Sequence, residues 1–312
     1  MLKVVKSFIG LVASVAVTST LILAAPLFAQ SLLTTVDHPP IGEQSALLAS
    51  PSYPDVFWVL MDSGNDPALF PLDPRGQIII PGFLQEHYSS GEVPYPGLSV
   101  LGAQNQDWES LAHLGDTLVI ADMGNNYNYR RDLALYFLLE PNPYQCPAAT
   151  PFLRLTVAYP DQTSWPAREW RFDCEATFSY KGELYFLTKH RKDRHPEKPA
   201  PSTRLYRLDT RDPGIVNNLT FVAELEDLGG WVTAADMSPD DERLAILVQN
   251  PLVSSVWVFR APKQGDDFFS MVPLVIPMPK VRQVEGIAFR DTESLIVSNE
   301  QRDWFLIQLD EH

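Results

Sequence analysis

The chain has 312 residues, with 24 Lys or Arg against 39 Asp or Glu, and its formal net charge is −15 at pH 7. A chain this acidic repels nucleic acid and anionic lipid, so we expect neither as a partner. Hydrophobic residues make up 45% of the sequence and aromatic residues 11%, which supports a large core and excludes an acidic disordered protein.

The N-terminal segment is typical of a secretory signal peptide. Two lysines precede the uncharged stretch 8–28, and Ala29 is a small residue suited to cleavage. We therefore expect a signal peptide over 1–29 and a single mature domain over 30–312, located in the periplasm or outside the cell. The alternative is an uncleaved anchor, since the stretch is nearly long enough to span a bilayer; that anchor would be the only contact with a membrane.

A short cassette recurs along the mature chain. It consists of an acidic residue followed, about ten positions later, by a short apolar run bounded by turn residues, which predicts a strand. The clear copies are Glu109 before 117–121, Glu175 before 184–187 and Glu285 before 295–297. The long interval between the last two predicts a fourth copy, which leads into 243–248 with Ala235 in place of the acid. A fifth, less regular copy begins at 45–50.

Each copy is followed by an apolar quartet. The quartets are 69–72, 135–138, 205–208, 256–259 and 306–309, and all but the last have an aromatic second residue. With one further strand between units, each unit becomes a four-stranded antiparallel sheet, and such repeats are typical of β-propeller blades. We expect an all-β propeller of five blades, with six as the alternative count, in which 31–36 supplies the strand that the last unit lacks. A β-sandwich also uses short strands, but it does not repeat a cassette at this interval.

Polar side chains are expected to gather at one mouth of this ring, because the start of the first strand of an antiparallel blade lies beside the end of the second. The candidate ligand-binding residues are Glu109, Glu175, Glu285 and Lys189. The candidate metal ligands are Asp62, Asp122, Glu109, Glu285 and Asn299. Since these metal ligands are all oxygen donors, calcium or another divalent cation is the expected cofactor. No dinucleotide fingerprint or P-loop is found, so no nucleotide cofactor is expected.

Structural roles are open for the same residues. A lone glutamate at each blade entrance can accept hydrogen bonds and hold neighbouring blades together. The loops 62–66 and 122–126 share an Asp-x-Gly-Asn pattern, which also suits a tight turn with glycine at positive φ. The basic segment 189–195 is predicted to be a solvated insertion, with an anion-binding finger as the alternative.

The two cysteines, Cys146 and Cys174, have no metal-binding spacing. An exported compartment permits a disulfide between them. The blade register, however, places them at opposite ends of neighbouring blades, and a bridge requires α-carbons within about 7 Å. Both the bridged and the free state are therefore open from the sequence.

Three inner-strand cassettes carry a resemblance to known proteins. They are Asp107-Trp108-Glu109, Asp173-Cys174-Glu175-Ala176 and Val284-Glu285-Gly286-Ile287-Ala288-Phe289. They resemble those of exported bacterial β-propellers, mostly uncharacterised, and more distantly the gluconolactonase-type and phytase-like esterase propellers. The gluconolactonase-type resemblance implies a divalent metal in the central channel, held by an inner-strand Glu with Asn and Asp side chains. Only Glu285-Gly286 matches that pattern residue by residue.

Two functions follow from these patterns. The first is a ligand-binding or scaffold propeller that holds a small molecule or a protein at its acidic mouth, with or without calcium. The second is a metal-dependent hydrolase of lactones, esters or phosphoesters, in which the ion polarises the carbonyl or phosphoryl oxygen and a carboxylate acts as the base. We favour the first, because a fold alone does not imply an activity.

Overall fold

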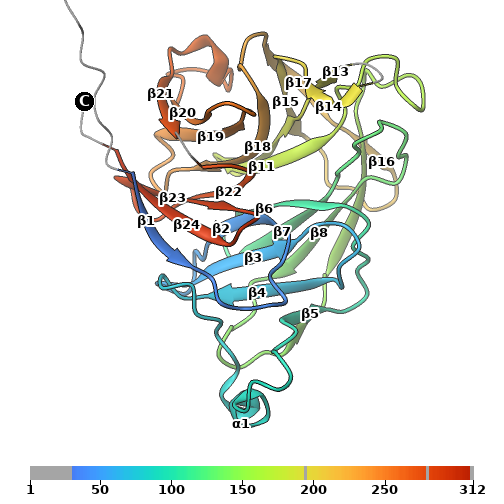
Figure 1. Cartoon of the computed structure of the whole chain (residues 1–312). Helices are drawn as coiled ribbons and strands as arrows, with labels where there is room; N and C mark the ends of the chain where they lie inside the picture. Colours follow the sequence, from blue (N-terminus) through green and yellow to red (C-terminus); the bar gives the residue numbers. More distant parts are fainter. Residues whose placement is uncertain (1–29, 193–194, 279–280, 310–312) are drawn as a thin grey trace, which may run out of the picture.

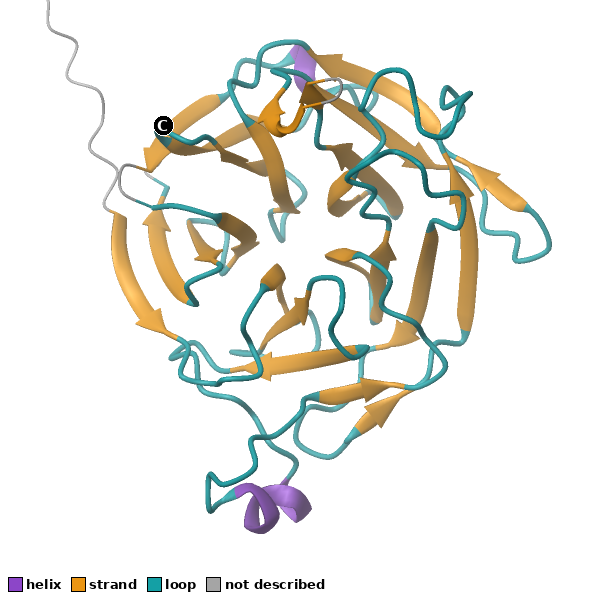
Figure 2. Cartoon of the chain, turned by 45° about the vertical axis from the view of Figure 1, so that its right-hand side comes forward, coloured by secondary structure: helices purple, strands orange, loops and turns teal. Residues whose placement is uncertain are grey.

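The computed structural model describes residues 30–192, 195–278 and 281–309, so the predicted signal peptide over 1–29 lies outside the described residues. Five β-sheets are set around a common axis, and strands make up almost all of the regular structure (Figures 1 and 2). The predicted all-β propeller is confirmed, with five blades. No helix in the described part of the chain is both long and apolar enough to span a bilayer.

The strands of each blade run outward from the axis in nearly sequential order. The first blade contains β2 (Gln44–Ala49), β3 (Phe57–Met61), β4 (Ala68–Leu72) and β5 (Leu98–Val100). The second contains β6 (Trp108–Leu114), β7 (Thr117–Asp122), β8 (Ala134–Leu139) and β10 (Leu153–Ala158). The third contains β11 (Cys174–Tyr180), β12 (Glu183–Thr188), β15 (Thr203–Leu208) and β17 (Thr220–Leu225). The fourth contains β18 (Trp231–Met237), β19 (Arg243–Gln249), β20 (Ser254–Arg260) and β21 (Leu274–Met278).

The fifth blade closes the ring with both ends of the chain. It contains β22 (Val284–Phe289), β23 (Ser294–Asn299), β24 (Asp303–Gln308) and, as its outer strand, β1 (Gln30–Thr35). β1 pairs antiparallel with β24 and comes from the opposite end of the sequence (Figure 1). The prediction that an N-terminal strand completes the last blade is confirmed.

Two short strands cross from one blade to the next. β9 (Ala148–Ala149) leaves the second blade and pairs in parallel with β5 of the first. β16 (Val216–Asn218) leaves the third blade and pairs in parallel with β10 of the second. Each adds a fifth strand to its neighbour's sheet, so the first three blades are joined through backbone hydrogen bonds as well as side-chain packing.

The remaining short elements lie outside the blades. They are η1 (Gly82–Leu84), α1 (Gln85–Tyr88), η2 (Phe268–Ser270) and a hairpin of β13 (Arg191–Lys192) and β14 (His195–Pro199). α1 lies at the tip of a long excursion between β4 and β5 of the first blade (Figure 1).

The core consists of five apolar clusters, one between each pair of neighbouring blades. Trp58 and Trp108, for example, belong to the cluster between the first two blades and have no exposed surface. A blade sheet is apolar on both faces, so it must be covered on both sides by its neighbours. This requirement explains why the ring has to be closed.

Candidate functional site

The innermost strand of every blade contains a β-bulge near its start. At each bulge the strand has one residue more than its partner, so that this residue has no partner in the ladder. The five bulge residues are Ser45, Glu109, Glu175, Thr233 and Glu285. The equivalent of the cassette acid in the fourth blade is therefore Thr233, and the sequence alignment on Ala235 was wrong by two positions.

The mouth of the ring holds a cavity of about 190 Å³. Its lining residues are Glu43, Gln44, Ser45, Asp62, Glu109, Asn126, Glu175, Lys189, Glu285 and Glu300. All four candidate ligand-binding residues thus lie together in one cavity. Asp62 lines it as well, so three of the five candidate metal ligands are there: Asp62, Glu109 and Glu285. The lining includes six carboxylates but a single lysine, so the mouth is strongly acidic.

Two candidate metal ligands do not line this cavity. The Asp122 carboxylate accepts a hydrogen bond from the Asp107 backbone N–H and lies 3.0 Å from Nη1 of Arg130. The side-chain oxygen of Asn299 accepts a hydrogen bond from the Asp303 backbone N–H at 2.9 Å. Both residues are buried, and both shape the loops behind the mouth.

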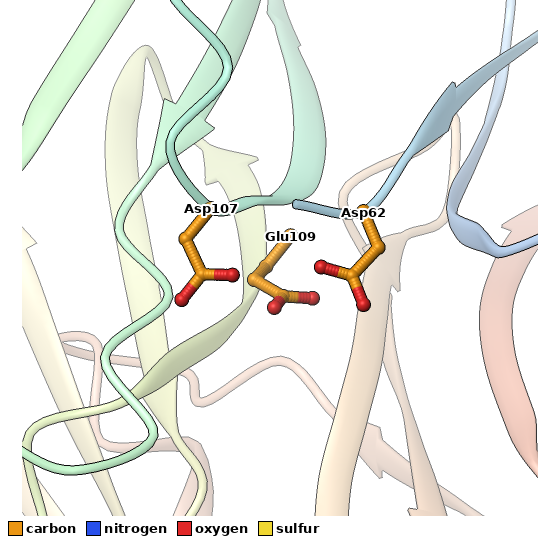
Figure 3. Close-up of side chains that lie close together, drawn as sticks. All are labelled: Asp62, Asp107 and Glu109. Carbon is orange, nitrogen blue, oxygen red and sulfur yellow. The ribbon is translucent and has the colours of Figure 1, made fainter. Parts of the chain in front are cut away.

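Asp107, which sequence reasoning did not single out as a ligand, lies instead with two of the predicted acids. One carboxylate oxygen from each of Asp62, Asp107 and Glu109 lies within 4.8 Å of the other two, and the three side chains point toward a shared space (Figure 3). We call these three residues the acid trio. The sequence signal that was available is the Asp-x-Glu spacing of Asp107 and Glu109, which puts two carboxylates on one side of a strand start.

Hydrogen bonds of a neighbouring asparagine hold the backbone segments that carry the trio in position. The side-chain amide of Asn105 donates to the backbone carbonyl of Asp62 at 3.0 Å, and its oxygen accepts from the Trp108 N–H at 3.0 Å. Asn105 therefore ties the loop that carries Asp62 to the strand start that carries Asp107 and Glu109. The trio is built from two adjacent blades and depends on their relative position.

Electrostatics in the trio favour protonation or a bound cation. Burial, then the charges of Glu175 and Asp62, raises the pKa of Glu109 well above its usual range. Burial, then the charges of Asp173 and Asp62, raises the pKa of Asp107 to about 7. The charges of Arg130 and Lys189 oppose these shifts only in part. Three converging carboxylates repel one another, and a cation between them relieves that repulsion.

On the opposite side of the mouth, basic side chains pair with the acidic ones. Nζ of Lys189 lies 3.0 Å from Oε2 of Glu175, and Arg191 pairs with Asp173 at 3.2 Å while its Nη2 donates to Asn126. Burial alone would lower the pKa of Lys189, but the charges of Glu175, Glu285 and Asp173 together outweigh it, and the net shift is upward. The two cations thus form their ion pairs with Glu175 and Asp173 of the third blade and not with the trio.

Glu285 lies between these two regions. Burial raises its pKa to about 7, while Lys189 opposes the shift and Glu300 adds to it. The residue that follows, Gly286, packs against the first blade: a Cβ there would lie 2.4 Å from Oγ of Ser298 and 2.9 Å from Cβ of Leu47. A glycine at this position is required by close packing between the fifth and first blades.

The basic segment predicted over 189–195 divides in two. Lys189 is buried and Arg191 is partly buried, and both form ion pairs at the mouth, whereas Lys192 and His195 are exposed on the β13–β14 hairpin. The cysteines are free thiols: Cys174 is buried between the second and third blades, and Cys146 lies beside the cluster between the first and second.

No protein-family model and no curated protein matches the sequence. Solved structures with a similar overall fold include three of low sequence identity to this chain. The first is the PQQ-bound aldose sugar dehydrogenase from Streptomyces coelicolor, with 9% identity over 90% of this chain and 97% of that chain and a TM-score of 0.49. The second is a 6-phosphogluconolactonase-like protein from Bacteroides uniformis, with 10% identity over 82% of this chain and 77% of that chain and a TM-score of 0.41. The third is an auxiliary nutrient binding protein from Bacteroides thetaiotaomicron, with 11% identity over 91% of this chain and 77% of that chain and a TM-score of 0.42. Likeness at this level carries no conclusion about ligand or activity.

Proposed function

We propose that this chain is an exported propeller that binds a small-molecule or protein ligand at its central mouth through a divalent cation, with calcium as the preferred ion. The observation that carries the proposal is the acid trio. One carboxylate oxygen from each residue lies within 4.8 Å of the other two, and the nearby cations Lys189 and Arg130 form ion pairs with Glu175 and Asp122 instead. Asp107 thereby joins Asp62 and Glu109 as a proposed metal ligand.

The chemistry of the trio suits a hard cation. Calcium takes roughly six to eight oxygen ligands in a flexible geometry, whereas zinc prefers nitrogen and sulfur. Three carboxylates supply part of that shell and leave positions for water and for oxygens of a bound ligand. A cation held this way connects the acidic mouth to an anionic or hydroxyl-bearing partner that the carboxylates alone would repel.

Thermal unfolding with and without calcium tests the cation site. A ligand that binds only the folded state raises its stability by RT ln(1 + [L]/Kd), so millimolar calcium should raise the Tm and a chelator should lower it. Glu109→Gln should abolish most of this response. Glu86→Gln, the same change at an exposed residue of α1, is the matched control and should keep it. A Tm that is indifferent to calcium, magnesium, manganese and chelator in the unaltered protein would refute the site.

A metal-dependent hydrolase is the second candidate. It is favoured by the position of Glu285, a carboxyl with a pKa near neutrality that lines the same cavity as Asp62 and Glu109. Such a group can act as a general base on a water near the cation. Turnover of lactones, aryl esters or phosphoesters that needs calcium and is lost in Glu285→Gln would support the hydrolase over the binding protein.

Export is the remaining part of the proposal. The uncharged stretch 8–28 ends at Ala29, and β1 begins one residue later, so cleavage there would leave the closing strand intact. The intact mass of the protein recovered from the periplasm or medium should start at Gln30. A mass that includes residues 1–29 would support the membrane anchor instead.

A further inference from the structure

A second, larger cavity of about 480 Å³ lies beside the mouth, on the rim of the second blade. We call it the rim pocket. It is lined by Ser63, Gln106, Asp107, Asn125, Asn126, Tyr127, Tyr129, Arg130, Arg131 and Asp132. Asp107 and Asn126 also line or border the central mouth, so the two spaces adjoin.

Two exposed tyrosines line the rim pocket. The side chains of Tyr127 and Tyr129 are 55% and 60% exposed, although tyrosine usually covers some of its ring with neighbours. Tyr127 is steadied by an edge-on contact with Trp170 at 6.0 Å between ring centroids. Each tyrosine offers an apolar ring face and a hydroxyl group. This combination suits a ligand that has an apolar face and polar groups at its edge.

Hydrogen-bonding groups without a partner surround these rings. The side chains of Ser63, Gln106, Tyr127 and Tyr129 make no hydrogen bond to another described residue. The Oδ1 atom of Asn126 accepts from Arg191, which leaves its NH₂ group available. The set contains both donors and acceptors, as hydroxyl-bearing ligands require.

Charge in the rim pocket is mixed. Arg130 is buried and already paired with Asp122 and Asp132 at 3.0 and 3.1 Å, and the Arg131 guanidinium lies over the Trp165 ring at 4.4 Å from its centroid. Asp107 opposes them. The carboxylates of Asp107 and Asp132 would repel a phosphate, and the two arginines would repel an amine, so a neutral ligand is favoured over either ion.

We propose that the rim pocket binds a neutral saccharide, whose C–H face stacks on Tyr127 or Tyr129 and whose hydroxyl groups bond to Gln106, Asn126 and Asp107. This inference names the ligand class for the proposed binding function and rests on it, but it does not require the cation. Asp107 belongs to both the pocket and the acid trio, so binding of a cation and binding of a saccharide are coupled. Each ligand strengthens or weakens the binding of the other by the same factor.

Calorimetric titration of the mature protein with cellotriose, maltotriose, xylotriose and chitotriose tests the inference. At least one should bind, and Tyr129→Ala or Gln106→Ala should weaken it about tenfold, as expected for the loss of roughly 1.4 kcal/mol. Tyr144→Ala is the matched control, since Tyr144 is 50% exposed in a different loop. Inorganic phosphate and spermidine, as ionic probes, should not bind at the pocket.

The outcomes separate the pocket from the cation site. Saccharide binding measured in chelator tests the pocket alone, and the calcium response measured without saccharide tests the trio alone. The inference is overturned if none of the four saccharides binds. It is also overturned if Tyr127→Ala and Tyr129→Ala leave saccharide binding unchanged. Tighter binding of phosphate or spermidine than of any saccharide also overturns it.

Discussion

Gly124 lies so close to Asp107 that a Cβ on the glycine would be 2.5 Å from the aspartate carboxylate, and 2.8 Å from Cγ of Glu109. The glycine of the first Asp-x-Gly-Asn loop, Gly64, has the expected positive φ of 81°, with open space around it. The two loops therefore share a sequence pattern for different physical reasons: one glycine permits a turn, and the other makes room for the acid trio.

Gly124→Ala should displace Asp107 and Glu109 and abolish the calcium-dependent rise in Tm, because atoms cannot approach within 3.0 Å without a shift of the backbone or the acids. Gly82→Ala, at a glycine with negative φ and open space, is the control and should retain the response. A full calcium response in Gly124→Ala would show that the trio does not hold the ion.

Lys189→Met should destabilise the fold by about 3 kcal/mol, because it leaves the buried Glu175 carboxyl with only Arg191 at 3.8 Å for compensation. Urea unfolding measures the change. The double variant Lys189→Met with Glu175→Gln should recover most of the loss, since the unpaired charge is then removed. Equal stability of the single and double variants would show that the loss of stability does not come from leaving Glu175 without Lys189.

Asp236 predicts a pH dependence of stability away from the mouth. Its carboxylate accepts hydrogen bonds from the Phe289 N–H at 2.7 Å and the Met237 N–H at 2.9 Å, and so joins the fourth blade to the fifth. Burial nevertheless raises the pKa of Asp236 from 3.8 to about 7. The folded chain therefore holds this proton more tightly than the unfolded chain does.

The sign follows from that difference. Stability from Asp236 is complete below pH 3.8 and is lost as the pH rises to about 7, by an amount on the order of a few kcal/mol. Unfolding free energies measured across this range should fall less steeply in Asp236→Asn than in the unaltered protein. Asp116→Asn, at an exposed turn, should keep the original slope. An unchanged slope in Asp236→Asn would contradict the assignment.

Removal of the closing strand tests the ring. A chain that starts at residue 37 lacks β1 and exposes the edge of β24, including Trp304, which is fully buried when the blade is complete. We expect it to unfold at a markedly lower temperature and to associate through the open edge, as size-exclusion chromatography would show. A chain that starts at Gln30 retains β1 and should be a stable monomer in the same assay.

The repeat, and with it the blade architecture and the acidic mouth, could be predicted from the amino-acid sequence alone. Strand runs, turns and the cassette acids recur at blade intervals, and antiparallel pairing places the starts of inner strands at one mouth. For that reason Glu109, Glu175, Glu285 and Lys189 could be assigned to one cavity without a structure. The closing role of 31–36 also follows, because a last blade with three strands leaves an open edge.

Features that depend on contacts between distant segments could not be predicted and became visible only in the folded chain. The bulge at Thr233, the pairing of Asp122 with Arg130 and the crossing strands β9 and β16 leave no periodic trace in the sequence. Asp107 joins the trio because Asn105 binds the Asp62 loop of the preceding blade. Register within a blade is local and repeats, whereas the approach of one blade to the next is set by packing among residues far apart in the chain.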